Sequence, residues 1–160
     1  IALGTALAAR VRGKDYWTYC ILGDGECDEG SNWEAAMTAS QYKVTNLISF
    51  VDRNKCMIDG CTEDVMKLEP FADKWKAFGF IVKEVDGHNI KELCDAIDFA
   101  LDNREAPVMI IADTVKGAGI DFMENDYRWH YGAIDEDKYN QAKASLDKYY
   151  EGRKARAEKG

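Results

Sequence analysis

The sequence predicts a three-layer α/β/α domain built around a mostly parallel sheet. Four apolar runs of strand length alternate along the chain with segments of helical periodicity, and this alternation is typical of α/β folds. Two of the runs, NLISFV and VMIIA, are continuously apolar, as expected of strands buried on both faces. With 160 residues and 46% hydrophobic residues, the chain can form a single domain with its own core.

The first strand is preceded by a helix and closed by glycine. Alanine, leucine and valine recur at helical spacing over 1–11, and Gly13 is expected to end that helix. The segment YWTYCIL at 16–22 is rich in β-forming residues and stops at Gly23.

The next helix is expected over 29–42, where Ser31 and Glu34 form the S-x-x-E pattern of a capping box. A buried strand follows at 46–51, and a loop is expected over 52–67. The rest of the chain repeats the alternation. It predicts a helix at 69–78, a strand at 80–85, a helix at 90–103, a strand at 108–112, a glycine-rich irregular segment at 116–132 and a polar helix at 135–154.

Composition excludes several classes of partner. The net charge of −8 argues against nucleic acid or an anionic membrane surface as the main partner. No apolar run approaches the roughly 20 residues of a membrane span. The five cysteines form no CxxC pair and no zinc spacing, which together with the absence of a signal peptide predicts reduced thiols in a cytoplasmic protein. Because the chain opens inside a helix with neither Met nor a cap, it is expected to be a fragment that lacks its N-terminal part.

Polar residues follow two neighbouring strands at the edge where ligands bind in such folds. Gly23-Asp24-Gly25-Glu26 links the first strand to a helix, and Asn54 comes just after the second strand. Glycines allow backbone to approach a diphosphate closely, while a carboxylate and an amide oxygen suit Mg²⁺, which takes few carboxylates and leaves positions for phosphate. The pair therefore predicts a magnesium–diphosphate site, although a GDG turn alone is equally well explained as a tight strand-to-helix connection.

Five landmarks in order resemble the transketolase family of thiamine-diphosphate enzymes. They are GDGECDEGSNWEAAMTAS, VDRNKCMIDG, VDGHNI, ADTVKGAG and WHYG. The resemblance covers most of the chain and implies the thiamine-diphosphate-binding fold, with thiamine diphosphate and Mg²⁺ as cofactors.

The resemblance also implies roles for individual residues. Asp24 and Asn54 would ligate Mg²⁺ through their side chains, and Cys56 through its backbone carbonyl. The diphosphate would be held by Gly23, Gly25 and the backbone that follows at Glu26. Lys116 would face the diphosphate or solvent.

Three further residues match positions of the family that serve the reaction. His130 matches a histidine that reaches the cofactor and the substrate, and the resemblance favours this role, although a histidine between Trp129 and Tyr131 could simply be packed. Glu29 and Glu34 match acids near the dimer interface that link paired active sites. For Glu34 the capping box is an equally good explanation.

The implied function is the transfer of a two-carbon ketol unit from a ketose phosphate to an aldose phosphate, as in the pentose phosphate pathway. The partner would be a C-terminal transketolase subunit that carries the pyrimidine-binding domain, in a dimeric or α2β2 assembly. The isolated chain is expected to be inactive. Three alternatives remain open: a 1-deoxyxylulose-5-phosphate synthase, the α subunit of a 2-oxo acid dehydrogenase, and a non-catalytic assembly subunit that keeps the fold.

Overall fold

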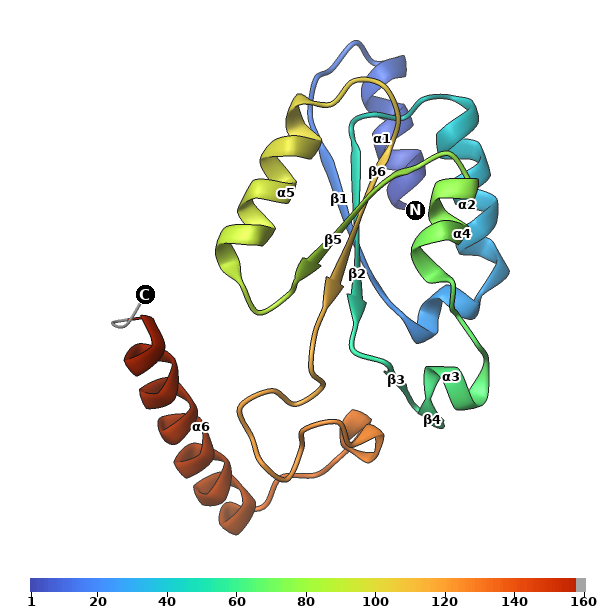
Figure 1. Cartoon of the computed structure of the whole chain (residues 1–160). Coiled ribbons are helices and arrows are strands. Elements are labelled where there is room, and N and C mark those ends of the chain that lie inside the picture. The colour runs from blue at the N-terminus through green and yellow to red at the C-terminus, as the bar shows by residue number, and fades with distance from the viewer. Residues whose placement is uncertain (158–160) are drawn as a thin grey trace.

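The computed structural model describes residues 1–157 and shows a twisted parallel sheet at the centre of the chain (Figure 1). Within these residues the main sheet has four strands in the order β1-β2-β6-β5, and every neighbouring pair is parallel. The strands are β1 (Thr18–Gly23), β2 (Leu47–Arg53), β5 (Ile81–Asp86) and β6 (Val108–Asp113). The predicted parallel α/β class is confirmed.

Helices cover both faces of the sheet, so the three-layer prediction is also confirmed (Figure 1). On one face lie α1 (Ala2–Val11), α2 (Gly30–Gln41) and α4 (Phe71–Ala77), and on the other lies α5 (Ile90–Asp102). The larger core cluster forms under the first group around Trp75, whose ring centroid lies 4.6 Å from that of Trp33. A smaller cluster under α5 contains Ile48, Val108 and Ile110.

The strand register brings the carboxyl ends of the strands to one edge. Gly23 at the end of β1 pairs with Asp52 of β2, and Arg53 pairs with Asp113 of β6. Beyond the strands, Thr114 N donates a hydrogen bond to Arg53 O at 3.2 Å. The chain segments that follow the first two strands therefore lie at one edge of the sheet, as predicted, and the segment after β6 joins them; we call this edge the rim.

The predicted capping box at Ser31 and Glu34 is wrong. The chain leaves β1 through a 3₁₀ turn, η1 (Gly25–Asp28), and the N-cap of α2 is Glu29. Asn32 Nδ2 donates to Glu26 O at 2.7 Å, which fixes the turn against the new helix. Because the turn runs directly into α2, Ser31 already lies inside the helix, where it cannot serve as the N-cap.

The expected loop at 52–67 is ordered into short elements. Strand β2 extends to Arg53, and an antiparallel hairpin, β3 (Cys56–Met57) and β4 (Gly60–Cys61), follows. The short helix α3 (Thr62–Val65) comes next. Two-residue strands show no measurable hydrophobic period, so sequence periodicity could not predict this hairpin.

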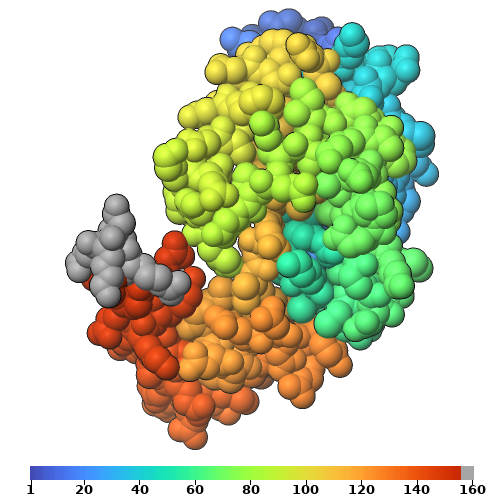
Figure 2. All heavy atoms as spheres, viewed as in Figure 1, coloured from blue at the N-terminus to red at the C-terminus, as the bar shows by residue number. Residues whose placement is uncertain are grey.

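The C-terminal part lies apart from the sheet (Figures 1 and 2). It contains the 3₁₀ turn η2 (Tyr127–His130) and the long helix α6 (Glu136–Ala157). Arg153 of α6 donates to His88 O at 2.9 Å, which joins this helix to the end of β5. Nowhere in residues 1–157 is a helix both long and apolar enough to span a bilayer.

Candidate cofactor and metal site

Asp24 is buried at the carboxyl end of β1, with 1% of its surface exposed. Its Oδ2 atom accepts hydrogen bonds from Lys55 N at 2.6 Å and from Arg53 at 3.0 Å, and its Oδ1 atom accepts from Gly25 N at 2.8 Å. Burial raises the pKa of Asp24, and these hydrogen bonds oppose the shift. Asp24 is therefore held in one orientation by the turn that it begins and the strand end beside it.

Arg53 is the cation that compensates the charge of the buried Asp24 carboxylate. No role was predicted for Arg53 from the sequence. It is 4% exposed and belongs to the end of β2. Its guanidinium contacts Asp24 Oδ2 at 3.0 Å, Glu63 Oε1 at 3.0 Å, Glu69 Oε1 at 2.9 Å and Thr62 Oγ1 at 2.8 Å. A planar guanidinium can bond several acceptors in this way, which an ammonium cannot do as well. Arg53 thus ties the β1 end to the segment that contains α3. The only signal for this role was its place between Asp52 and Asn54.

Asn54 and the backbone of Cys56 face the same side of the hairpin. Asn54 Oδ1 accepts from Cys56 N at 3.0 Å, while Asn54 Nδ2 donates to Asp52 Oδ2 at 3.0 Å. In a strand the N–H and C=O groups of one residue point to the same side. The Cys56 carbonyl is therefore directed toward the side where Asn54 lies, which supports its predicted role as a ligand.

The two glycines of the turn have different surroundings. A Cβ atom added at Gly25 would lie 2.8 Å from Met57 Cβ, closer than side chains pack, so Gly25 allows the turn to approach the hairpin. A Cβ atom added at Gly23 would meet Glu26 only at 3.9 Å. Gly23 N donates to Glu26 Oε2 at 3.1 Å and Gly25 N donates to Asp24. Both amides predicted to hold the diphosphate are thus engaged by carboxylates of the chain itself.

His130 and Lys116 lie in the segment beside the hairpin. The turn η2, which ends at His130, is next to both β3 and β4. His130 itself is exposed, with its ring 4.8 Å from that of Tyr131. Burial raises the pKa of the Cys56 thiol, and the charge of the Lys116 ammonium opposes this shift.

Glu29, the N-cap of α2, and Glu34, in the second turn of that helix, are both exposed. They are not gathered around Asp24, and within residues 1–157 they form no part of its hydrogen-bond network. Their predicted role at a subunit interface stays a prediction.

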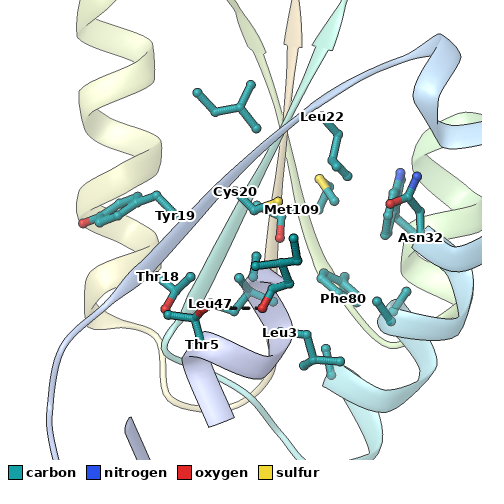
Figure 3. Close-up of a pocket in the computed structure, with 18 of the residues that line it drawn as sticks. Leu3, Thr5, Thr18, Tyr19, Cys20, Leu22, Asn32, Leu47, Phe80 and Met109 are labelled. Carbon is teal, nitrogen blue, oxygen red and sulfur yellow. Dashed lines mark hydrogen bonds between the residues drawn. The ribbon is translucent and has the colours of Figure 1, made fainter. Parts of the chain in front are cut away.

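A separate cavity of about 520 Å³ lies beside β1 (Figure 3), and neither Asp24 nor Asn54 is among the residues that line it. Side chains from α1, β1 and α2 line it, among them Leu3, Leu22 and Asn32, and Glu26 reaches its margin. In the described part of the chain β1 is an edge strand. The mostly apolar lining makes this cavity a poor site for a diphosphate or a metal ion.

Two further contacts fix the rim. Thr114 Oγ1 donates to Asp52 Oδ1, and Asp52 in turn holds Asn54. His88 Nε2 accepts from Val115 N at 2.9 Å, which holds the loop after β5 against the chain that follows β6. Asp52 and Thr114 were missed because such positioning contacts depend on strand register, which the sequence does not show.

The oxygen atoms at this rim fit Mg²⁺ and an attached diphosphate. Asp24 Oδ1 accepts one hydrogen bond from the described residues, so it has acceptor capacity left for a cation. No group of three or more His, Cys, Asp or Glu residues in the described chain could form a metal site of its own. Mg²⁺ does not require such a group, since one carboxylate, neutral oxygens and phosphate oxygens satisfy it.

Comparisons with known proteins show the family of the chain. Residues 9–152 match the family model described as transketolase, thiamine diphosphate binding domain. The chain is 39% identical over 142 residues to one subunit of the apulose-4-phosphate transketolase of Phocaeicola vulgatus, covering 89% of this chain and 50% of that protein. It is 42% identical over 147 residues to a 6-deoxy-6-sulfo-D-fructose transketolase subunit of Clostridium sp., covering 92% of this chain and 54% of that protein.

A solved structure shows the same fold. The crystal structure of transketolase from Campylobacter jejuni aligns with a TM-score of 0.84 at 29% identity, covering 91% of this chain and 24% of that one. The chain spans about half the length of the curated subunits that it matches. On the family match, the chain belongs to the transketolase family and comprises its thiamine-diphosphate-binding domain.

Proposed function

We propose that this chain is the cofactor- and Mg²⁺-binding part of a two-subunit transketolase, which transfers a two-carbon ketol unit between sugar phosphates. The observation that carries the proposal is the convergence of Asp24, Asn54 and the Cys56 backbone at the carboxyl edge of the sheet. Relatives that are named as individual subunits of transketolases support the need for a partner protein. A cytoplasmic location and a dimeric or α2β2 assembly belong to the same proposal.

Each residue at the rim has a defined task in this proposal. Asp24 and Asn54 would hold Mg²⁺ together with the Cys56 carbonyl, and the bound cation would supply positive charge for the diphosphate. When bound, thiamine diphosphate supplies the nucleophilic carbon and the electron sink needed to break a carbon–carbon bond beside a ketone. The chain itself orients the cofactor and moves protons. Lys116 adds positive charge near the diphosphate.

His130 is proposed to transfer protons at the sugar hydroxyls. Its exposed position in η2, beside the hairpin that carries Cys56, leaves it open to a substrate. Acid–base assistance by a positioned histidine is worth about 10²–10⁴-fold in rate.

For the assembled enzyme we therefore expect His130→Ala to lower kcat by at least about 100-fold while the affinity for thiamine diphosphate stays within the error of calorimetry. His88→Ala is the matched control, because His88 makes a backbone contact at the same rim but has no proposed role in proton transfer. Its kcat should fall much less than that of His130→Ala. Equal losses of turnover and cofactor affinity in His130→Ala would instead indicate a packed histidine.

The function itself is tested by reconstitution. We expect the protein to transfer two-carbon units only when a partner with the pyrimidine-binding domain, Mg²⁺ and thiamine diphosphate are all present. The donors to compare are xylulose 5-phosphate, apulose 4-phosphate and 6-deoxy-6-sulfofructose, with ribose 5-phosphate as acceptor, and the measurement is product formation by chromatography.

Each alternative gives a different result in this assay. Turnover by the 160-residue chain alone would show that the site has been misassigned. Use of a 2-oxo acid such as pyruvate in place of a ketose would favour the synthase or the dehydrogenase subunit. Cofactor binding without turnover on any donor would favour a non-catalytic subunit.

A further inference from the structure

Two cysteines face each other across the hairpin beside the candidate metal ligands. Cys56 of β3 is the register partner of Cys61 of β4. Lys55 and Thr62 follow this pair on the side away from the hairpin turn, and Thr62 N donates a hydrogen bond to Lys55 O at 3.0 Å. In an antiparallel ladder bonded and non-bonded pairs alternate, so Cys56 and Cys61 form a non-hydrogen-bonded pair. Their side chains project from the same face of the hairpin.

The spacing of such a pair permits a disulfide. The Cα atoms of a non-hydrogen-bonded pair are about 4.5 Å apart, and disulfides span Cα separations of about 4.4–6.8 Å. This spacing lies at the short end of the range, so closing the bond requires a small separation of the strands or a strained bond. Strained disulfides are more easily reduced, which makes such a bond reversible.

The two thiols differ in exposure. Cys61 is exposed, whereas Cys56 is 8% exposed, and both are free thiols in this structure. Of the remaining cysteines, Cys94 is exposed on α5 and Cys27 is fully buried, where burial above all raises its pKa to about 12. A reagent from solvent therefore reaches Cys61 first, and Cys56 is its opposite neighbour on the hairpin.

We propose that Cys56 and Cys61 are a thiol modification site that forms a reversible disulfide with a low-molecular-weight disulfide as oxidant. The Cys61 thiolate attacks one sulfur of the oxidant and displaces the first small thiol, which takes up the proton that Cys61 has lost. Cys56 then loses its proton and attacks the Cys61 sulfur, which releases the second small thiol. The protein is oxidised by two electrons, and one small disulfide is reduced to two thiols.

Oxidation at this site acts on the proposed metal site, and this consequence rests on the proposed function. Cys56 N is bonded to Asn54 Oδ1 at 3.0 Å, and the Cys56 carbonyl is a candidate ligand. Separating the strands to close the disulfide shifts this backbone. Contacts that orient ligands are worth about 10–100-fold in metal affinity, so the oxidised chain is expected to bind Mg²⁺-thiamine diphosphate at least about tenfold more weakly.

The experiment treats the protein with oxidised glutathione and maps its thiols by mass spectrometry. Trypsin cleaves after Lys55 and Lys67, so Cys56 and Cys61 fall in one peptide. We expect that peptide to lose the mass of two hydrogen atoms and to regain them with dithiothreitol. Affinity for Mg²⁺-thiamine diphosphate is measured by calorimetry on the oxidised and the reduced protein.

Two cysteine variants test whether the disulfide requires Cys61 and not another exposed cysteine. Cys94→Ser should still form the disulfide, and Cys61→Ser should form none and keep its cofactor affinity under oxidant. Circular dichroism checks that each variant is folded. Stable glutathione adducts on Cys61 without the internal bond would overturn the modification site. A disulfide that leaves affinity unchanged would overturn its link to the metal site, and absence of cofactor binding by the reduced protein would count against the proposed function instead.

Discussion

Replacing Arg53 by methionine is expected to lower the free energy of unfolding by about 3–5 kcal/mol, because it leaves a buried carboxylate without its cation. Asp24 is 1% exposed and its salt bridge to Arg53 is 3.0 Å long. The bonds from Arg53 to Glu63 and Glu69 contribute less, since those side chains are 38% and 58% exposed. Urea denaturation followed by circular dichroism measures the effect.

The control is a surface ion pair of similar geometry. Lys91 and Asp95 form a 2.6 Å pair on α5 with exposed fractions of 81% and 61%. Lys91→Met should cost much less stability than Arg53→Met, because water screens such exposed pairs. Arg53→Lys should recover part of the stability, since an ammonium keeps the charge but loses the planar donor set. If Arg53→Met and Lys91→Met cost the same, Arg53 does not stabilise the site.

Replacing Asp24 by asparagine is expected to weaken Mg²⁺-dependent binding of thiamine diphosphate by more than about 100-fold, since contacts that merely orient ligands already cost about 10–100-fold when removed. Asparagine keeps the shape of the side chain but removes the only charge that it brings to the metal. Calorimetry with and without Mg²⁺ separates the metal-dependent part of the binding.

Asp113→Asn is the matched control for this prediction. Asp113 lies at the end of the neighbouring strand β6 and pairs with Lys55 at 2.8 Å, with 64% of its side chain exposed. Loss of this exposed pair should change cofactor affinity by less than about fivefold, which corresponds to the about 1 kcal/mol that such pairs are worth at most. If both variants lose a similar amount of cofactor affinity, the binding depends on the total negative charge of the rim and not on ligation of the metal by Asp24.

The strands of the sheet could be predicted because their signals are local. The run at 108–112 is apolar at every position, and the structure places it in β6, between β2 and β5. A strand covered on both faces needs no polar positions, so its type is readable from the sequence alone. The rim positions of Asp24 and Asn54 followed from the same reasoning, because parallel strands share one carboxyl edge.

The remaining contacts of the site depend on tertiary geometry. Arg53 is a polar residue at the end of an apolar strand, and its burial follows from partners up to 29 positions away. The hairpin at Cys56 and Cys61 is held partly by Lys55 N, which donates to Asp24 rather than to the ladder. Such contacts produce no hydrophobic periodicity in the sequence. The residue types at these positions could be read from the sequence, but their contacts could not.

The hydrogen bonds between the amides of Gly23 and Gly25 and carboxylates of the chain itself affect how strongly this turn can bind a ligand. Glu26 accepts from Gly23 N at 3.1 Å, so a diphosphate that uses this donor displaces an intramolecular competitor. Glu26 is tethered beside Gly23 and therefore competes for its amide at a high effective concentration. Replacing the carboxylate by a phosphate as the hydrogen-bond acceptor adds little to the net free energy of binding. If the ligand is a diphosphate with Mg²⁺, as proposed, selectivity at this turn comes from the cation that the diphosphate brings rather than from the hydrogen bond to Gly23 N.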